Sequence, residues 1–190
     1  AVLASSLGSP FQMMAFRGIG SVLAAHRYHT LFHNVRSEDQ EDPNTLESLR
    51  AYRPAGYIVL RGAEGHHGVH ARAILKEGVP LVAQGKLENL ETHCVLFDNR
   101  AAMKQAADYV IEKGHRRLGH LAGPAFSVGA KQRKLGFIEG LIQHDIPVSD
   151  AKIVDAGETA ADGYLGALEI LKDPAGRPTA LLCFNDMVAM

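Results

Sequence analysis

Short apolar runs alternate along the chain with segments of helical periodicity, and this alternation constrains the fold more than any other feature. Seven runs have the length and composition of buried strands, namely residues 1–4, 30–33, 57–60, 81–83, 94–97, 118–122 and 180–184. Continuous apolar strands are typical of a parallel sheet that helices cover on both faces. The order of strand, helix, strand and helix therefore predicts a doubly wound α/β fold with right-handed crossovers.

Three segments between these runs have the signals of amphipathic helices. In the first, Ser9 is placed to cap the helix and Pro10 to occupy its first position. The second ends at Gly114, and the third opens with a variant of the capping box, Thr159-Ala-Ala-Asp162. The apolar stripe of the first helix consists of Phe11, Met14, Ala15, Gly18, Ile19, Val22 and Leu23. The third helix is expected to bury Tyr164, Leu165, Leu168 and Leu171.

One connection is too short for a crossover helix. The runs 81–83 and 94–97 are joined by the polar loop 85–93, so the chain is expected to leave one parallel sheet there and enter another. This spacing places a domain boundary near Phe97 and Asp98. The chain starts in a strand pattern without Met and stops within a helix pattern at residues 185–190, so we expect it to be part of a longer protein.

The charge balance of the chain excludes a general attraction to polyanions. Its 20 Lys and Arg residues are offset by 21 Asp and Glu residues, for a net charge of −1. Such a chain has no electrostatic pull toward nucleic acid or an anionic membrane. No apolar run reaches the length of about 20 residues that a membrane span needs. Cys94 and Cys183 lie inside predicted strands, and buried free thiols in a reducing compartment explain them better than a disulfide does. We therefore expect a soluble cytoplasmic protein.

Signals for catalysis, a cofactor or a metal are weak. His66 and His70 would share one face of a helix, as a zinc pair requires, but no further ligand follows at a suitable spacing. The chain has no Gly-x-Ser-x-Gly motif for a nucleophilic serine. Gly18 and Gly20 lie inside a predicted helix, whereas a dinucleotide-binding motif would open one. We therefore expect no enzymatic activity, no cofactor and no metal site.

Six sequence blocks form a recognisable set of motifs. They are Asp-Asn-Arg at 98–100, Gly-His-Arg-Arg-Leu-Gly-His-Leu-Ala-Gly-Pro at 114–124, Arg-Lys-Leu-Gly-Phe at 133–137, Gly-Tyr at 163–164, Arg-Pro-Thr-Ala at 177–180 and Asn-Asp-Met-Val-Ala-Met at 185–190. These blocks and their spacing resemble the effector-binding domains of the LacI/GalR family of bacterial transcription regulators. The similarity extends more weakly to Ser5-Ser6 and to residues 9–11.

The resemblance implies a fold and a mechanism. The fold is two Rossmann-like subdomains around a ligand cleft, as in sugar-binding periplasmic proteins. Residues 1–97 would form most of the first subdomain and residues 98–190 part of the second. A small-molecule effector, such as a sugar or related metabolite, would bridge the subdomains and change their relative orientation. In a homodimer this change would alter the affinity of two DNA-binding headpieces for operator DNA.

Ligands of open α/β sheets bind beyond the carboxyl ends of the strands, so the loops after the strands hold the candidate site residues. Ser5, Ser6 and Phe11 follow the first run, and hydroxyls with an aromatic face suit a sugar or a purine. The alternative is that the serines cap the helix and Phe11 packs in the core. Arg61 and Lys86 follow the third and fourth runs, where a cation could hold a hydroxyl, carboxylate or phosphate or simply face solvent.

Four further candidates come from the second half of the chain. The resemblance assigns Arg133 to a family arginine that binds effector oxygens from the first turns of a helix, and Asn185 to an effector-contacting asparagine. Asn185 could also cap the next helix, and Asp98 could either cap its helix or line the cleft. Glu158 stands where several family members have an aromatic residue. A carboxylate there indicates a more polar or cationic effector group, or an exposed loop.

Two other functions are compatible with the fold. A periplasmic sugar-binding protein is less consistent with the cysteine usage and with the Gly-His-Arg-Arg block at 114–117, which is more typical of regulators. An enzyme on a doubly wound fold would need a nucleotide or metal site. The chain itself has no helix pair with a basic recognition face, so DNA binding is expected from a helix-turn-helix module ahead of residue 1.

Overall fold

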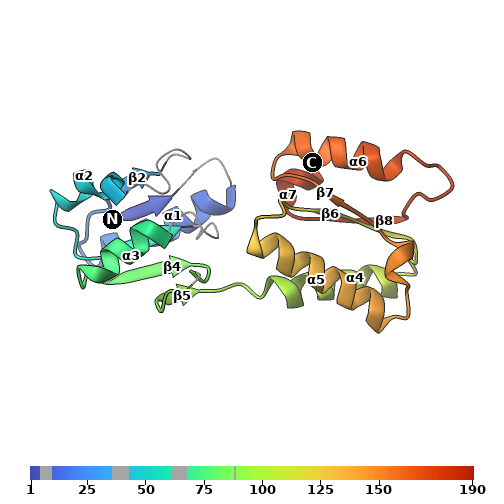
Figure 1. Cartoon of the computed structure of the whole chain (residues 1–190), viewed down its shortest axis with the longest axis horizontal. Helices are drawn as coiled ribbons and strands as arrows, with labels where there is room; N and C mark the ends of the chain where they lie inside the picture. Colours follow the sequence, from blue (N-terminus) through green and yellow to red (C-terminus); the bar gives the residue numbers. More distant parts are fainter. Residues whose placement is uncertain (5–9, 36–42, 61–67, 88) are drawn as a thin grey trace. The chain divides into compact units, whose positions relative to one another are not determined.

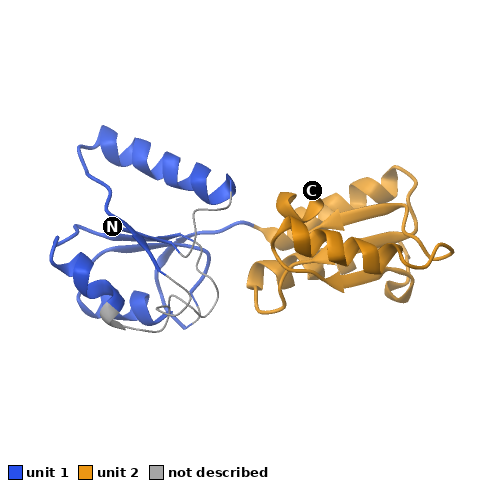
Figure 2. Cartoon of the chain, turned by 90° about the horizontal axis from the view of Figure 1, so that it is seen from above, with its two compact units in different colours: residues 1–97 blue, residues 98–190 orange. Residues whose placement is uncertain are grey.

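The structure is a computed structural model of the chain, and it describes residues 1–4, 10–35, 43–60, 68–87 and 89–190. These residues form two compact units, Ala1–Phe97 and Asp98–Met190 (Figure 2). Each unit contains one parallel β-sheet with helices packed around it, so the predicted α/β class with two parallel sheets is confirmed. No helix in the described ranges is both long enough and apolar enough to cross a bilayer.

Unit 1 is built on a five-stranded parallel sheet with the order β2-β1-β3-β4-β5. The strands are β1 (Val2–Ala4), β2 (Phe32–Asn34), β3 (Tyr57–Leu60), β4 (Leu81–Gln84) and β5 (His93–Val95). Strands β4 and β5 pair in this one sheet, so the expected change of sheet between them is wrong, and the chain leaves the unit only after Phe97. Cys94 of β5 is exposed, because this edge strand is not covered. The described helices are α1 (Pro10–Ala25), the 3-10 turn η2 (Pro43–Leu46), α2 (Glu47–Arg50) and α3 (Gly68–Lys76). The main core of the unit joins the central strands to α3, η2 and α2, and includes Leu3, Leu46, Leu49, Val59 and Ile74.

Helix α1 begins where the sequence places it, but its apolar stripe is only partly buried. Ala15 and Ile19 pack against a small cluster on β1 and β3. Phe11 and Met14, by contrast, have exposed fractions of 52% and 72%. The reason is that α1 carries apolar residues on more than one face, and the sheet covers one of them.

Unit 2 is built on a three-stranded parallel sheet with the order β7-β6-β8. Its strands are β6 (Leu118–Ala122), β7 (Lys152–Asp155) and β8 (Ala180–Cys183). Its helices are α4 (Asn99–Glu112), α5 (Val128–Gln143), the 3-10 turn η3 (Val148–Asp150), α6 (Ala160–Leu171) and α7 (Asp186–Ala189). Helices α4 and α5 cover one face of the sheet, and α6 and α7 cover the other (Figure 1). Strand β7 was not predicted, because its four residues are bounded by Lys152 and Asp155.

Helices α4 and α5 approach each other closely at a glycine. A Cβ atom at Gly136 would overlap the backbone oxygen of Arg100 and lie 3.0 Å from the backbone nitrogen of Lys104. Next to this contact, Ala107 of α4 and Phe137 of α5 are fully buried. The two helices can therefore approach this closely only because Gly136 has a hydrogen in place of a Cβ atom. Together with the sheet, the helix pair forms the main core of unit 2.

The orientation predicted for α6 is wrong, although its capping box is confirmed at Thr159 and Asp162. The residues expected in the core are exposed, with fractions of 66% for Tyr164, 63% for Leu165, 53% for Leu168 and 39% for Leu171. The buried face holds Gly163, Gly166 and Ile170. A Cβ atom at Gly163 would overlap the backbone of α7, and one at Gly166 would lie 2.8 Å from the Leu121 side chain. Helix α6 therefore packs through its glycines, which allow close approach to α7 and β6, and leaves its larger apolar side chains exposed.

A histidine lies in the core of unit 2. His120 of β6 is fully buried, its Nδ1 lies 2.9 Å from the carbonyl oxygen of Leu182, and its ring stacks on Phe137 with centroids 5.0 Å apart. The carbonyl can only accept, so Nδ1 carries the proton in that bond. Burial lowers the pKa of His120; the hydrogen bond to Leu182 opposes this shift, and the positive charges of Lys134 and Arg133 add to it. The lowered pKa favours the neutral form of the ring.

Candidate functional site

The carboxyl end of the sheet in unit 2 brings together polar groups from four segments. Arg133 comes from α5, Asn99 from the first position of α4, Glu158 from the loop after β7, and Phe184 and Asn185 from the loop after β8. The carboxyl ends of parallel strands meet at one edge, which explains why residues so far apart in the sequence gather there. This edge of unit 2 is the candidate site.

Arg133 is held by three contacts within unit 2. Its Nε donates a hydrogen bond to Oδ1 of Asn99 at 3.0 Å, and one terminal nitrogen donates to the carbonyl oxygen of Phe184. Its guanidinium carbon also lies 4.7 Å from the centroid of the Phe184 ring, a cation–π contact. Burial lowers the pKa of Arg133, and the negative charge of Asp186 opposes that shift. A guanidinium keeps its charge under such conditions and has five N–H donors, so it can still donate to a ligand oxygen.

Asn185 and Glu158 connect the two loops that follow β7 and β8. The Oδ1 atom of Asn185 accepts from the backbone nitrogen of Val188 at 2.8 Å, which is the expected N-cap of α7. Its Nδ2 atom donates to the carbonyl oxygen of Glu158 at 3.4 Å. The backbone nitrogen of Glu158 donates to the carboxylate of Asp162 at 3.0 Å. The backbone of Glu158 is thus fixed from both sides, while its half-buried side chain belongs to the loop at the edge of the sheet.

Asp98 has the capping role that was one of its two predicted functions. Its carboxylate accepts from the backbone nitrogen of Ala101 at 2.9 Å and so caps α4. The side chain is exposed. Because Asp98 is the first residue of unit 2, the chain enters a capped helix directly at the boundary.

Of the candidates from unit 1, Ser5, Ser6 and Arg61 lie outside the described residues, and Lys86 is exposed after β4. Phe11 does not pack in the core. Its ring meets that of Phe97 edge-on, with centroids 5.5 Å apart and an interplanar angle of 72°, and both rings are more than half exposed.

Sequence reasoning missed Phe97, because it assigned this residue to a strand that ends at Val95. The available signal was a large apolar side chain directly before the boundary between the units.

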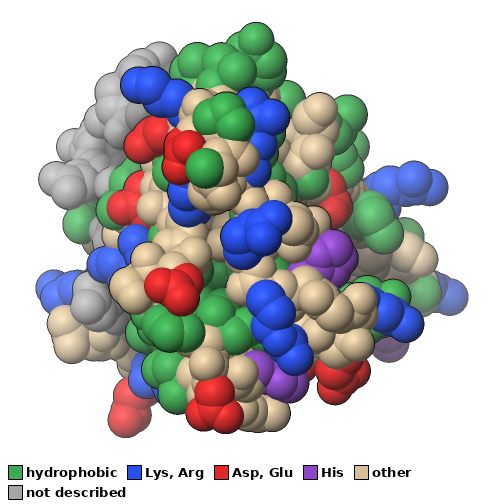
Figure 3. Space-filling view, turned by 90° about the vertical axis from the view of Figure 1, so that its right-hand side faces the viewer, with side chains coloured by type: hydrophobic (Ala, Val, Ile, Leu, Met, Phe, Trp, Pro, Cys, Tyr) green, Lys and Arg blue, Asp and Glu red, His purple; other side chains and the backbone are tan. Residues whose placement is uncertain are grey.

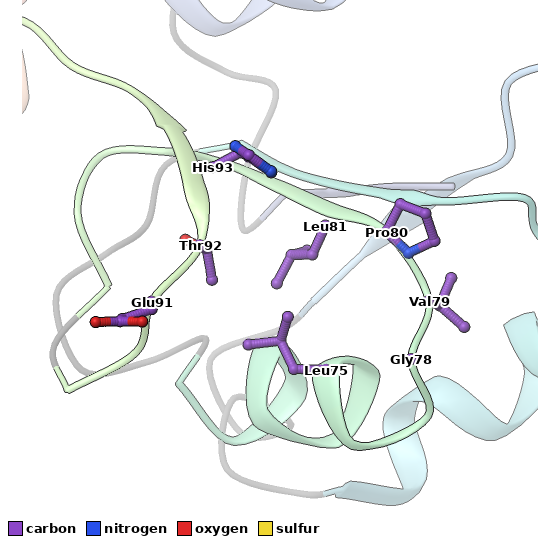
Figure 4. Close-up of a pocket in the computed structure, with 8 residues that line it drawn as sticks. All are labelled: Leu75, Gly78, Val79, Pro80, Leu81, Glu91, Thr92 and His93. Carbon is purple, nitrogen blue, oxygen red and sulfur yellow. The ribbon is translucent and has the colours of Figure 1, made fainter.

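One cavity lies at the carboxyl edge of unit 2, and another lies in unit 1. One of about 220 Å³ lies at the carboxyl end of β6 and β7 and is lined by Ala122, Gly123, Ala125, Ala130, Lys131, Lys134 and Asp155. Nζ of Lys134 lies 3.0 Å from the Asp155 carboxylate, so that lysine is paired across the cavity wall. A larger cavity of about 650 Å³ lies in unit 1, lined by Leu75, Gly78, Val79, Pro80, Leu81, Glu91, Thr92 and His93 (Figure 4). It contains the first residues of β4 and β5, at the edge opposite to the one where parallel sheets bind ligands, so we do not assign the effector to it.

The described residues include no group of three or more His, Cys, Asp or Glu side chains arranged to hold a metal ion. His66 and His67 lie outside them, and His70 is buried in α3. The face shown in Figure 3 has basic and acidic side chains interspersed. Two of the arginines of unit 2 bind backbone carbonyls, since Nε of Arg117 donates to Arg177 at 3.1 Å and Nε of Arg177 donates to Leu171 at 2.8 Å.

Comparison with known proteins identifies the family. The sequence matches the family described as "Periplasmic binding proteins and sugar binding domain of LacI family" over residues 1–190. The HTH-type transcriptional repressor CytR of Escherichia coli K12 is 24% identical over 196 residues, which cover all of this chain and 55% of CytR. The chain thus spans about half the length of the curated relatives it matches.

Solved structures share this fold. A regulatory protein of the LacI family from Chloroflexus aggregans has a TM-score of 0.83 at 23% identity, covering 99% of this chain and 69% of that one. A LacI family transcriptional regulator from Enterococcus faecium, solved with bound ribose, has a TM-score of 0.81 at 20% identity, covering 99% and 67%. The chain belongs to the family of periplasmic binding proteins and LacI-type sugar-binding domains, and its curated relatives are LacI-family transcription regulators.

Proposed function

We propose that this chain is the effector-sensing part of a bacterial transcription regulator, and that a sugar or related metabolite binds at the carboxyl ends of its strands. The observation that carries the proposal is the charged, largely buried Arg133, held in place at that edge of unit 2. A pre-positioned guanidinium forms strong, directional bonds to ligand oxygens. The relatives are transcription regulators, which favours this function over an enzyme and over a periplasmic binding protein.

The proposed ligand contacts come from both units. They are Ser5, Ser6, Phe11, Arg61 and Lys86 in unit 1, and Asp98, Arg133, Glu158 and Asn185 in unit 2. Exposed aromatic rings offer a flat apolar surface, which suits the C–H face of a sugar or a nucleobase. Arg133 and the side-chain amide of Asn185 would bind the oxygen atoms of the ligand. In this arrangement the ligand shifts an equilibrium between two orientations of the units because it binds one of them more tightly.

We extend this proposal to a homodimer that binds operator DNA in the cytoplasm. The exposed apolar residues of α6 support self-association, because Tyr164, Leu165 and Leu168 would be removed from water against a second copy. DNA contact would come from a helix-turn-helix module outside this chain. Sedimentation of a Leu165→Glu variant of the full-length protein tests the dimer, which is expected to dissociate, whereas an unchanged mass would place the dimer interface elsewhere.

The effector site can be tested by calorimetry on the full-length protein with D-ribose, D-galactose, cytidine and hypoxanthine. Arg133→Ala is expected to weaken binding by about 2–4 kcal/mol, because ligand oxygens lose a charged donor. Lys172→Ala is the control, since Lys172 is an exposed cation of the same unit at the C-terminal end of α6, away from the carboxyl ends of the strands. Equal affinity of the parent and Arg133→Ala proteins would remove Arg133 from the site.

The sequence encoded upstream of residue 1 distinguishes a transcription regulator from a periplasmic binding protein, the two functions that share this fold. A helix-turn-helix module there would support the regulator, whereas a secretion signal would support the periplasmic protein. A gel shift with a duplex from the promoter region tests the same point. The bare chain is expected to give no specific shift at moderate salt, and the full-length protein is expected to give one that responds to the effector.

A further inference from the structure

Asn99 occupies an unusual place in unit 2, between the boundary of the unit and its candidate ligand-binding arginine. It is the first residue of α4 and follows the cap, Asp98, directly. Because Asp98 accepts the hydrogen bond from Ala101, the start of α4 is capped without the Asn99 side chain. That side chain is partly buried, and its Oδ1 accepts from Nε of Arg133 at 3.0 Å.

The contacts of Arg133 restrain the guanidinium from two directions. Phe184 supplies a carbonyl oxygen and a ring, and both come from the end of β8. Asn99 comes from α4 and fixes Nε, the atom that defines the plane of the guanidinium together with its terminal nitrogens. An unrestrained arginine loses side-chain entropy when it is ordered. An arginine that is already ordered in the free protein avoids most of that cost when a ligand binds.

We propose that Asn99 is a positioning residue of the effector site, which acts by fixing the plane of the Arg133 guanidinium. This inference rests on the proposed function, since it assigns Arg133 to the ligand.

A double-mutant cycle separates this role from a merely structural one. We compare Asn99→Ala, Arg133→Ala and the double variant in the full-length protein, by calorimetry with D-ribose, D-galactose, cytidine and hypoxanthine. Asn99→Ala is expected to weaken binding by roughly 5- to 30-fold in the parent and to have no effect in the Arg133→Ala background. Asn99→Asp keeps the acceptor oxygen and is expected to stay within about threefold of the parent. Gln105→Ala removes an exposed amide from the same helix and serves as the control.

A measurement without ligand tests the same contact. The Nε–H proton of Arg133, observed by nitrogen-15 NMR, is expected to exchange with water more slowly than those of exposed arginines. Asn99→Ala should accelerate this exchange, while Gln105→Ala should leave it unchanged. Unchanged exchange in Asn99→Ala, or an equal loss of affinity in both backgrounds of the cycle, would overturn the role of Asn99. If none of the four compounds binds the parent protein, the proposed ligand class fails, and the exchange measurement still decides whether Asn99 positions Arg133.

Discussion

Substitution of Gly136 by alanine probes the closest helix contact of unit 2. The added Cβ would overlap the backbone oxygen of Arg100 and lie 2.9 Å from its carbonyl carbon. Backbone atoms of a helix cannot move aside singly, so α4 and α5 have to separate. Overpacking of this kind costs about 1–3 kcal/mol, and the higher helix propensity of alanine returns about 0.5–1 kcal/mol. We therefore expect a net loss of about 1–2 kcal/mol, which lowers the Tm of a unit of this size by about 4–16 °C.

Thermal unfolding followed by circular dichroism measures this loss. Gly18→Ala is the matched control, because Gly18 also lies in the middle of a 16-residue helix and has no atom within 4 Å of its added Cβ. That substitution is expected to leave the Tm unchanged or to raise it slightly. Should Gly136→Ala melt at or above the parent temperature, the contact between α4 and α5 would not be limited by this glycine.

Three further predictions concern unit 2. His120 has a lowered pKa in the folded state, so the unfolded chain binds more protons, and stability should fall as the pH drops below about 6.5. Melting curves from pH 7 to pH 5 should show this loss for the parent protein and a smaller one for His120→Leu; parallel curves would mean that His120 does not titrate on unfolding. Thr159→Ala removes the N-cap of α6 and should lower the free energy of unfolding, measured by chemical denaturation, by about 1 kcal/mol; an unchanged value would show that this cap does not stabilise the unit. Glu158→Trp should favour flatter and less polar compounds in a ligand screen, and an unchanged ranking would show that this side chain does not face the ligand.

The strands were predictable from sequence where apolar runs are continuous. Tyr57–Leu60 has the predicted bounds, because an uninterrupted apolar run between turn residues has few alternatives. Leu118–Ala122 also has the predicted bounds, although Gly119 and His120 interrupt its apolar residues. Strand β7 escaped prediction because its polar ends leave only Ile153 and Val154 as apolar residues. The face of α6 was wrong for a different reason. Hydrophobic periodicity predicts that the face with the large apolar side chains is buried. It gives no weight to Gly163, which allows a close contact with the backbone of α7 and so places the opposite face against the core.

The candidate site was predictable in its location but only partly in its contacts. Arg133 could be assigned from the resemblance alone. Its partners could not, because Asn99 and Phe184 lie 34 and 51 residues away in the sequence and meet Arg133 only through the fold. The capping roles of Asp98 and Asn185 followed from local sequence, since an N-cap bonds to a backbone nitrogen three residues ahead.

The short passage between the two units has a consequence for how a bridging ligand would be captured. The last residue of unit 1 is Phe97, and the next residue, Asp98, already caps a helix, so the described chain has almost no slack at the boundary. A tether this short keeps each unit at a high effective concentration for the other, of the millimolar order typical of short linkers or above. If one unit bound a ligand as proposed, engagement of the second would be a first-order step, whose rate would not depend on the protein concentration.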